Sequence, residues 1–248
     1  QFEKYLSSIS IKEEFLSKVF IEMKSYSGQS IKPKSLNKLK LLENLIGFKD
    51  IYERALDCYE VKNKTYIGSK EIMCEEFLTY FTNNGTKSIV IVRDPRDVLA
   101  SSNYPRHKKY LGEKKPTLFI LRTWKKSVKH INQLKNNKNF CFIKYEDLVC
   151  EPYKSLDKIT NFLNLPAFKE HFFDDGIFNR DGSMWQANSS FNKSSNFISN
   201  KSINVFEKIL SNQEINYVES ICQSEMEVLR YQFNTTPNQE IIKNFRDY

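Results

Sequence analysis

The sequence predicts an α/β domain whose parallel sheet is covered by helices on both faces. Two segments, 88–92 and 140–145, are typical of buried strands because β-branched and aromatic residues dominate them. Segments with helical spacing precede and follow both strands, and such alternation favours a parallel sheet. The 248 residues contain no repeat and no linker of low complexity, which predicts a single domain over residues 1–248.

The first third of the chain is predicted from apolar spacing and from turn residues. Its expected elements are a helix at 11–26, two helices within 35–58, a short strand at 65–69, a helix at about 71–81 and a turn at 83–85. The strand at 88–92 follows that turn and opens the alternating middle of the chain.

The clearest helix is expected at 117–135, where apolar residues recur every three or four positions. The opposite side of this helix carries Lys125, Lys126 and Lys129, which we expect to form a solvated face. The next strand, 140–145, follows this helix directly.

The last part of the chain is predicted to hold two further helices separated by a loop. One helix is expected to begin near Pro152, and the polar residues 174–202 are expected to form the loop. Ser211 and Glu214 have the spacing of a capping box, which predicts the start of a helix with apolar residues as far as Leu229.

Residues 88–102 are the most informative segment of the chain. The strand ends at Arg93, Asp94 suits the N-cap of the next helix, and Pro95 suits its first position. Ser101 follows Arg93 by eight residues, about two helical turns. A cation at the carboxyl end of a parallel strand, beside a helix N-terminus, is typical of an anion site. Arg93 and Ser101 are therefore predicted to hold one phosphate from two sides.

This segment resembles the 3′-phosphate-binding motif of the sulfotransferases that use 3′-phosphoadenosine 5′-phosphosulfate (PAPS). In that family an Arg at the strand end and a Ser eight residues later hold the 3′-phosphate, and Arg93 and Ser101 match them. The resemblance implies a three-layer α/β fold, in which a parallel sheet is flanked by helices as in P-loop NTPases. It also implies PAPS as co-substrate and no metal.

Three further stretches extend the resemblance to about residues 60–231. The first is Tyr-Glu-Asp-Leu at 145–148, followed by a helix that opens with a proline and closes with Phe-Leu. We interpret its two acidic residues, Glu146 and Asp147, as caps of the following turn that offset nearby lysines. The other two stretches imply nucleotide contacts from a loop and a lysine that faces the sulfuryl group, and the implied residues are Trp185, Asn188, Ser189, Ser190 and Lys70.

The family also begins with a strand and a glycine-containing loop, of the Ser-Gly-Thr-Thr kind, that binds the 5′-phosphosulfate. Such a loop binds its anion through backbone N–H groups. This sequence contains no match to it, since its first glycine, Gly28, follows a predicted helix. We therefore expect either a domain that lacks its N-terminal strand and phosphosulfate loop, or a degenerate member of the family.

Composition limits the other classes of function. The net charge is +8, but basic residues gather in one loop, 105–115, and not along a face, so we expect no nucleic-acid partner. That loop favours an anionic or glycan acceptor. The five cysteines include no Cys-x-x-Cys pair, which argues against a metal site and favours reduced thiols. No apolar run is long enough to span a membrane. We expect a cytoplasmic protein, or a Golgi-lumenal one if an anchor precedes the sequence.

The resulting hypothesis is transfer of a sulfuryl group from PAPS to a hydroxyl or amine by in-line displacement. The acceptor stays open among glycan, lipid and small metabolite. The general base stays unassigned, and its candidates are His107, His130, His171, Glu3, Glu13 and Glu14. Two alternatives remain: a nucleotide-binding protein of this fold without activity, and a fragment of a P-loop kinase-type enzyme.

Overall fold

A computed structural model describes Gly68, Lys70 and residues 74–104, 114–168, 171–178, 184 and 197–246. The chain divides into two units, Gln1–Glu71 and Ile72–Tyr248. All helices and strands reported below belong to the second unit. The helices predicted at 11–26 and 35–58 lie outside the described residues.

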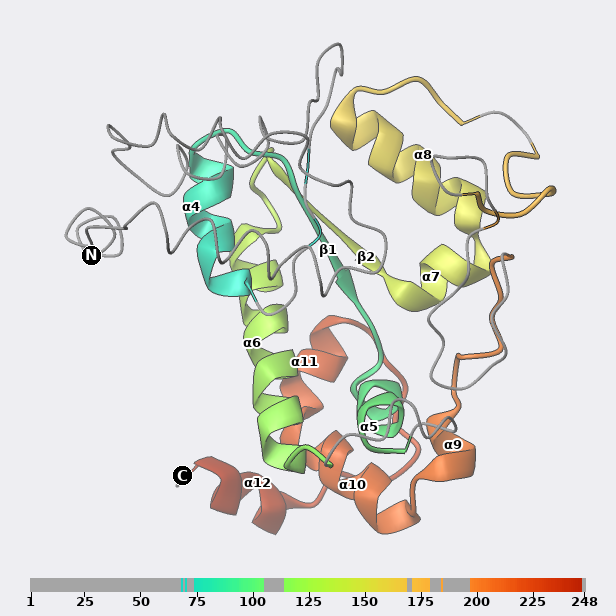
Figure 1. Cartoon of the computed structure of the whole chain (residues 1–248). Coiled ribbons are helices and arrows are strands. Elements are labelled where there is room, and N and C mark those ends of the chain that lie inside the picture. Colours follow the sequence, from blue (N-terminus) through green and yellow to red (C-terminus); the bar gives the residue numbers. More distant parts are fainter. Residues whose placement is uncertain are drawn as a thin grey trace, which may run out of the picture. The chain divides into compact units, whose positions relative to one another are not determined.

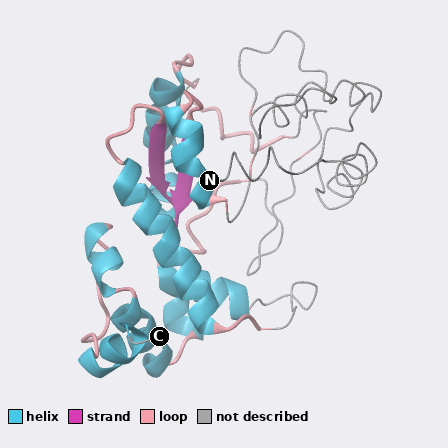
Figure 2. Ribbon diagram, turned by 90° about the vertical axis from the view of Figure 1, so that its left-hand side faces the viewer, coloured by secondary structure: helices cyan, strands magenta, loops and turns pink. Residues whose placement is uncertain are grey.

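Two parallel strands form the described sheet. β1 (Ser88–Val92) pairs with β2 (Phe140–Lys144) in a register that places Ser88 opposite Phe140. Figure 2 shows the two strands side by side and pointing the same way. The parallel pairing confirms the prediction. Burial on both faces is wrong for β1, because Ile89 and Ile91 are exposed, Ile91 to 56%.

The connection between the strands contains α5 (Pro95–Asn103) and α6 (Thr117–Leu134). The apolar positions predicted for α6 are buried, among them Leu121, Trp124 and Val128. Figure 1 shows α6 running beside α11 (Gln223–Val228). The predicted solvated face is wrong at Lys125, whose Nζ donates to Glu225 at 2.6 Å and to the Ile221 carbonyl at 2.7 Å.

Short helices precede β1 and follow β2. A 3-10 helix, η2 (Glu75–Phe77), leads into α4 (Leu78–Asn83). β2 ends at Lys144, one residue earlier than predicted, because Tyr145 begins α7 (Tyr145–Cys150). The helix α8 (Pro152–Leu163) starts at the expected proline.

The described parts of 174–202 contain turns and one isolated bridge, between Phe178 and Met184, which agrees with the predicted loop. After it come α9 (Phe206–Ile209), α10 (Asn212–Ile221), α11 and α12 (Gln239–Arg246). The capping box of Ser211 and Glu214 is formed and opens α10 as predicted. The single helix expected as far as Leu229 is two helices, because the backbone leaves helical geometry at Cys222.

The core lies between one face of the sheet and the helices α5, α6, α10 and α11. It is continuous across these elements, and representative members are Val92, Leu99, Leu121, Val218 and Met226. No described helix has both the length and the apolar composition that crossing a membrane requires.

Candidate functional site

The turn between β1 and α5 is held from three elements. Asp94 caps α5, since its carboxylate accepts the backbone N–H of Arg96 at 2.9 Å. The backbone N–H of Asp94 donates to Glu146 Oε1 at 2.9 Å, and Trp124 Nε1 donates to the carbonyl of Arg93 at 2.8 Å. The predicted N-cap is therefore confirmed. Because the Asp94 carboxylate already occupies the N-terminus of α5, binding of an anion at this turn depends on side-chain donors.

Arg93 presents its guanidinium at this turn. An N–H of the guanidinium donates to the carbonyl of Ser202, and the group lies 4.7 Å from the centre of the Tyr145 ring. A second contact joins it to Asp97 at 3.4 Å. Its Nε is buried and has no hydrogen-bond partner, although the side chain as a whole is 19% exposed. A buried N–H without an acceptor is costly, so this donor suits an anionic ligand.

Asp97 sits between the two residues predicted to bind phosphate. Its side chain is 1% exposed, and its two oxygens accept the backbone N–H groups of Asn204 and Phe206, each at 2.9 Å. Burial raises the pKa of Asp97 above the ordinary value of an aspartate. The carboxylate therefore ties α5 to the chain at 204–206 and also contacts the guanidinium of Arg93.

Ser101 lies four residues after Asp97 in α5, so it falls on the same side of the helix as Asp97 and its partner Arg93. Its side chain is half-buried. Within the described part of the chain its hydroxyl has no recorded hydrogen bond and is available to a ligand. The structure thus brings Arg93 and Ser101 to one side of one helix.

Arg96 and Glu146 stabilise this turn, and sequence reasoning missed both roles. Arg96 is buried against Asp94 at 2.6 Å, Glu219 at 2.5 Å and the amide oxygen of Asn234 at 2.7 Å. The interpretation of Glu146 as a cap of the following turn is wrong. Glu146 accepts from Asp94 N and from the Tyr231 hydroxyl, at 3.0 Å for the latter. Burial raises the pKa of Glu146.

The structure describes only some of the other residues that the sequence predicted for the site. Lys70 is exposed and belongs to the first unit. The loop residues Trp185, Asn188, Ser189 and Ser190 lie outside the described residues, as do the base candidates His107, Glu3, Glu13 and Glu14. Of the other base candidates, His171 is exposed and lies 2.6 Å from Asp174, and His130 has a buried Nδ1 without a partner.

A parallel strand pair covered by helices, with an arginine directly after one strand, is typical of an α/β protein that binds an anion. Comparison with known proteins identifies the family. A family model described as the sulfotransferase domain matches residues 14–230, so this chain belongs to the sulfotransferase family. Membership confirms the resemblance and identifies a transferase family whose reaction is sulfuryl transfer.

A solved structure gives the same fold. The sulfotransferase domain from the curacin biosynthetic pathway is similar over 94% of this chain and 84% of that chain, with a TM-score of 0.55. The sequences are 21% identical, so this likeness concerns the fold alone. No curated protein sequence matches the chain.

Proposed function

We propose that this protein transfers a sulfuryl group from PAPS to a hydroxyl or amine, and that Arg93 and Ser101 hold the 3′-phosphate of the donor. The observation that carries the proposal is the buried Nε of Arg93, which lacks an acceptor at the end of a parallel strand. A phosphate oxygen would satisfy this donor with a charge-assisted hydrogen bond. The family match favours this reading over a kinase-type fragment.

The loop that includes Trp185 is proposed to cover the nucleotide. The chain after that loop is tied to the phosphate turn, since Ser202 accepts from Arg93 and Asn204 donates to Asp97. Within the proposal Trp185 stacks on the nucleotide or anchors the loop, while Asn188, Ser189 and Ser190 contact ribose or phosphate. Lys70 is proposed to face the sulfuryl group. These roles presuppose the three-layer, P-loop-like fold that the resemblance implies.

In the proposed reaction the protein orients donor and acceptor for in-line displacement at sulfur. Arg93 and Ser101 fix the nucleotide end of the donor. Hydrogen bonds to Trp124 and Glu146 fix the backbone of the turn, so the donor is held without rearrangement of the backbone. An inactive nucleotide binder would share this site, and turnover of PAPS separates the two.

The first test is calorimetric titration with 3′-phosphoadenosine 5′-phosphate (PAP), with adenosine 5′-phosphate as the control ligand. We expect tight binding that requires the 3′-phosphate. Arg93→Ala should weaken PAP binding by about 1.5–3 kcal/mol, the scale of a hydrogen bond to a charged group. Arg122→Ala, which removes an exposed arginine of α6, should change nothing. An unchanged dissociation constant for Arg93→Ala would refute the site.

A further inference from the structure

Asp97 links Arg93, the proposed phosphate residue, to a distant part of the chain. Its carboxylate is buried in the first turn of α5, where Oδ2 accepts the backbone N–H of Asn204 and Oδ1 accepts that of Phe206, each at 2.9 Å. Oδ2 also lies 3.4 Å from Nη2 of Arg93. Figure 1 shows the consequence for the elements, since α9, which begins at Phe206, lies beside α5.

Arg93 also contacts this distant segment directly. Its Nη2, the nitrogen that faces Asp97, donates to the carbonyl of Ser202. The contacts therefore close a ring that runs from Arg93 to Ser202, along the chain to Asn204, and back through the Asp97 carboxylate. Because Ser202 and Asp97 both act on one nitrogen, the guanidinium cannot turn away without losing both contacts.

The ring of contacts leaves donors of Arg93 for a ligand. Both polar contacts that the described residues make with the guanidinium fall on Nη2, while the buried Nε has no acceptor. The 3.4 Å separation from Asp97 is longer than a charge-assisted hydrogen bond, which measures about 2.7–2.9 Å. Arg96 differs, because its bonds to Asp94 and Glu219 are 2.6 and 2.5 Å long. Asp97 thus orients Arg93 without taking up its donors.

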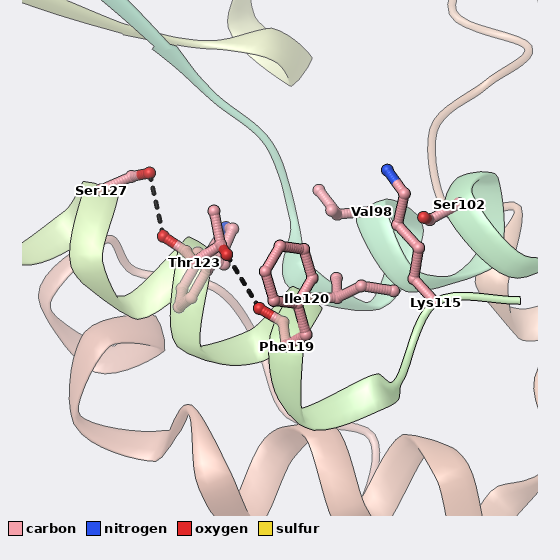
Figure 3. A pocket seen from close by; sticks show the side chains of 8 residues that line it. Val98, Ser102, Lys115, Phe119, Ile120, Thr123 and Ser127 are labelled. Atoms are coloured by element: carbon pink, nitrogen blue, oxygen red, sulfur yellow. Dashed lines mark hydrogen bonds between the residues drawn. The ribbon is translucent and has the colours of Figure 1, made fainter. Parts of the chain in front are cut away.

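The face of α5 that carries Asp97 is separate from the face toward α6. Figure 3 shows Val98 and Ser102 at a pocket between α5 and α6. Asp97 and Ser101 precede these two residues by one position, which turns them about 100° around the helix axis. Ser101 therefore shares with Asp97 a face that lies toward residues 202–206 and not toward the pocket.

We propose that Asp97 is the positioning residue of the donor site. By holding Arg93 and the chain at 202–206 together, its carboxylate fixes the guanidinium for the 3′-phosphate, although it does not touch the donor itself. The inference rests on the proposed function. It makes a negative charge favourable to the binding of an anion, the opposite of what charge alone predicts.

The physical reason is the cost of ordering a long side chain. An arginine that becomes immobilised only when its ligand binds loses affinity, by roughly three- to tenfold. The link to Asp97 orders Arg93 before the ligand arrives. Repulsion between Asp97 and a phosphate is weakened, because two backbone N–H groups and the guanidinium already offset the carboxylate charge, so we expect the ordering effect to prevail.

Asp97→Asn tests the proposal. An amide has one acceptor oxygen instead of two, so the variant loses one backbone hydrogen bond and the charge that faces Arg93, while the size of the side chain is kept. We expect the dissociation constant for PAP to rise roughly three- to tenfold. An unchanged constant, or the tighter binding that charge alone predicts, would refute the role of Asp97.

Glu219→Gln is the matched control. Glu219 is also buried, also accepts two backbone N–H groups, those of Asn234 and Thr235, and also pairs with an arginine, but that arginine is Arg96. The control should leave PAP affinity unchanged. If both variants weakened PAP binding equally, the loss would reflect any broken buried carboxylate, and Asp97 would have no special role.

A double-mutant cycle separates positioning from general damage to the fold. In the Arg93→Ala background Asp97 has no guanidinium to orient, so Asp97→Asn should cause no further loss of PAP affinity. A role in stability alone predicts the same loss in both backgrounds, and that result would overturn the proposal.

Hydrogen exchange in the wild-type protein gives a measurement that does not depend on the folding of a variant. Saturating PAP should slow exchange at the backbone N–H groups of Asn204 and Phe206 roughly tenfold more than at those of Asn234 and Thr235. The reason is that a ligand on Arg93 reinforces only the segment bonded to Asp97. Equal slowing of the two pairs would contradict the link.

The two proposals fail in different ways. If the wild-type protein binds PAP no better than adenosine 5′-phosphate, the proposed function is refuted and the role of Asp97 with it. If the wild-type protein prefers PAP and Asp97→Asn binds it equally well, the donor site stands and only the role of Asp97 is refuted.

Discussion

At the scale of single residues, burial separates two arginines that the sequence presents as equals. Arg93 and Arg96 lie three residues apart in the same motif. Arg93 keeps an unpaired Nε, whereas Arg96 is fully engaged by two carboxylates and stacks 4.2 Å from the centre of the Phe206 ring. Arg93 is therefore the ligand-binding candidate and Arg96 the structural one.

Arg96→Met tests the structural role. The substitution leaves the buried carboxylates of Asp94 and Glu219 without their cation, and a broken buried ion pair costs about 3–5 kcal/mol. We expect a loss of that size in the free energy of unfolding, measured with urea. Lys126→Met removes the cation of an exposed pair and should cost less than about 1 kcal/mol. Equal losses would show that Arg96 contributes no more than a surface lysine.

At the scale of elements, α5 organises the site. Its N-cap fixes the Arg93 turn, Asp97 holds the chain at 204–206, and Arg96 reaches α10. Because several elements converge on this helix, a change in the packing of α10 should be transmitted to the site.

The capping box of α10 provides the test for an element. Ser211 Oγ accepts from the backbone N–H of Glu214, and Glu214 accepts from the backbone N–H of Ser211. Ser211→Ala should lower the free energy of unfolding by about 1 kcal/mol, because it removes the acceptor for the first-turn N–H. Ser211→Asp retains an acceptor and should restore most of that loss. If the two variants were equally stable, the cap would not support α10.

At the scale of the whole molecule, buried carboxylates make stability depend on pH. Burial raises the pKa of Glu146 above the ordinary value of 4.5, so the folded protein retains this proton to a higher pH than the unfolded chain does. The associated stabilisation is complete below pH 4.5 and is lost as the pH rises through the raised pKa. The hydrogen bond from Tyr104 lowers the pKa of Glu214. The stabilisation associated with Glu214 is therefore lost as the pH falls, which is opposite to the effect of Glu146.

Two variants separate these contributions. Glu146→Gln keeps the shape of the side chain and removes its titration, so its stability relative to wild type should increase as the pH rises above 4.5. For Glu214→Gln the relative stability should increase as the pH falls below 4.5. Urea unfolding at a series of pH values measures both. If the relative stability of both variants changed with pH in the same direction, the opposite pKa shifts of Glu146 and Glu214 would be contradicted.

The sequence alone determined the features that depend on neighbours along the chain. The strand before Arg93, the cap by Asp94, the stripe of α6 and the capping box at Ser211 were predicted, because period, capping and turn chemistry are local. The spacing of Arg93 and Ser101, which is also local, indicates the family to which the chain belongs.

Only the tertiary structure decided which polar groups meet across the chain. The partnership of Glu146 with the turn, the engagement of Arg96 by Glu219 and the contact of Ser127 with Glu75 join residues far apart in sequence. Local periodicity contains no information about such contacts, because the packing of helices against the sheet selects them. The same packing left the Nε of Arg93 buried without an acceptor, so the site depends on the fold as much as on its motif.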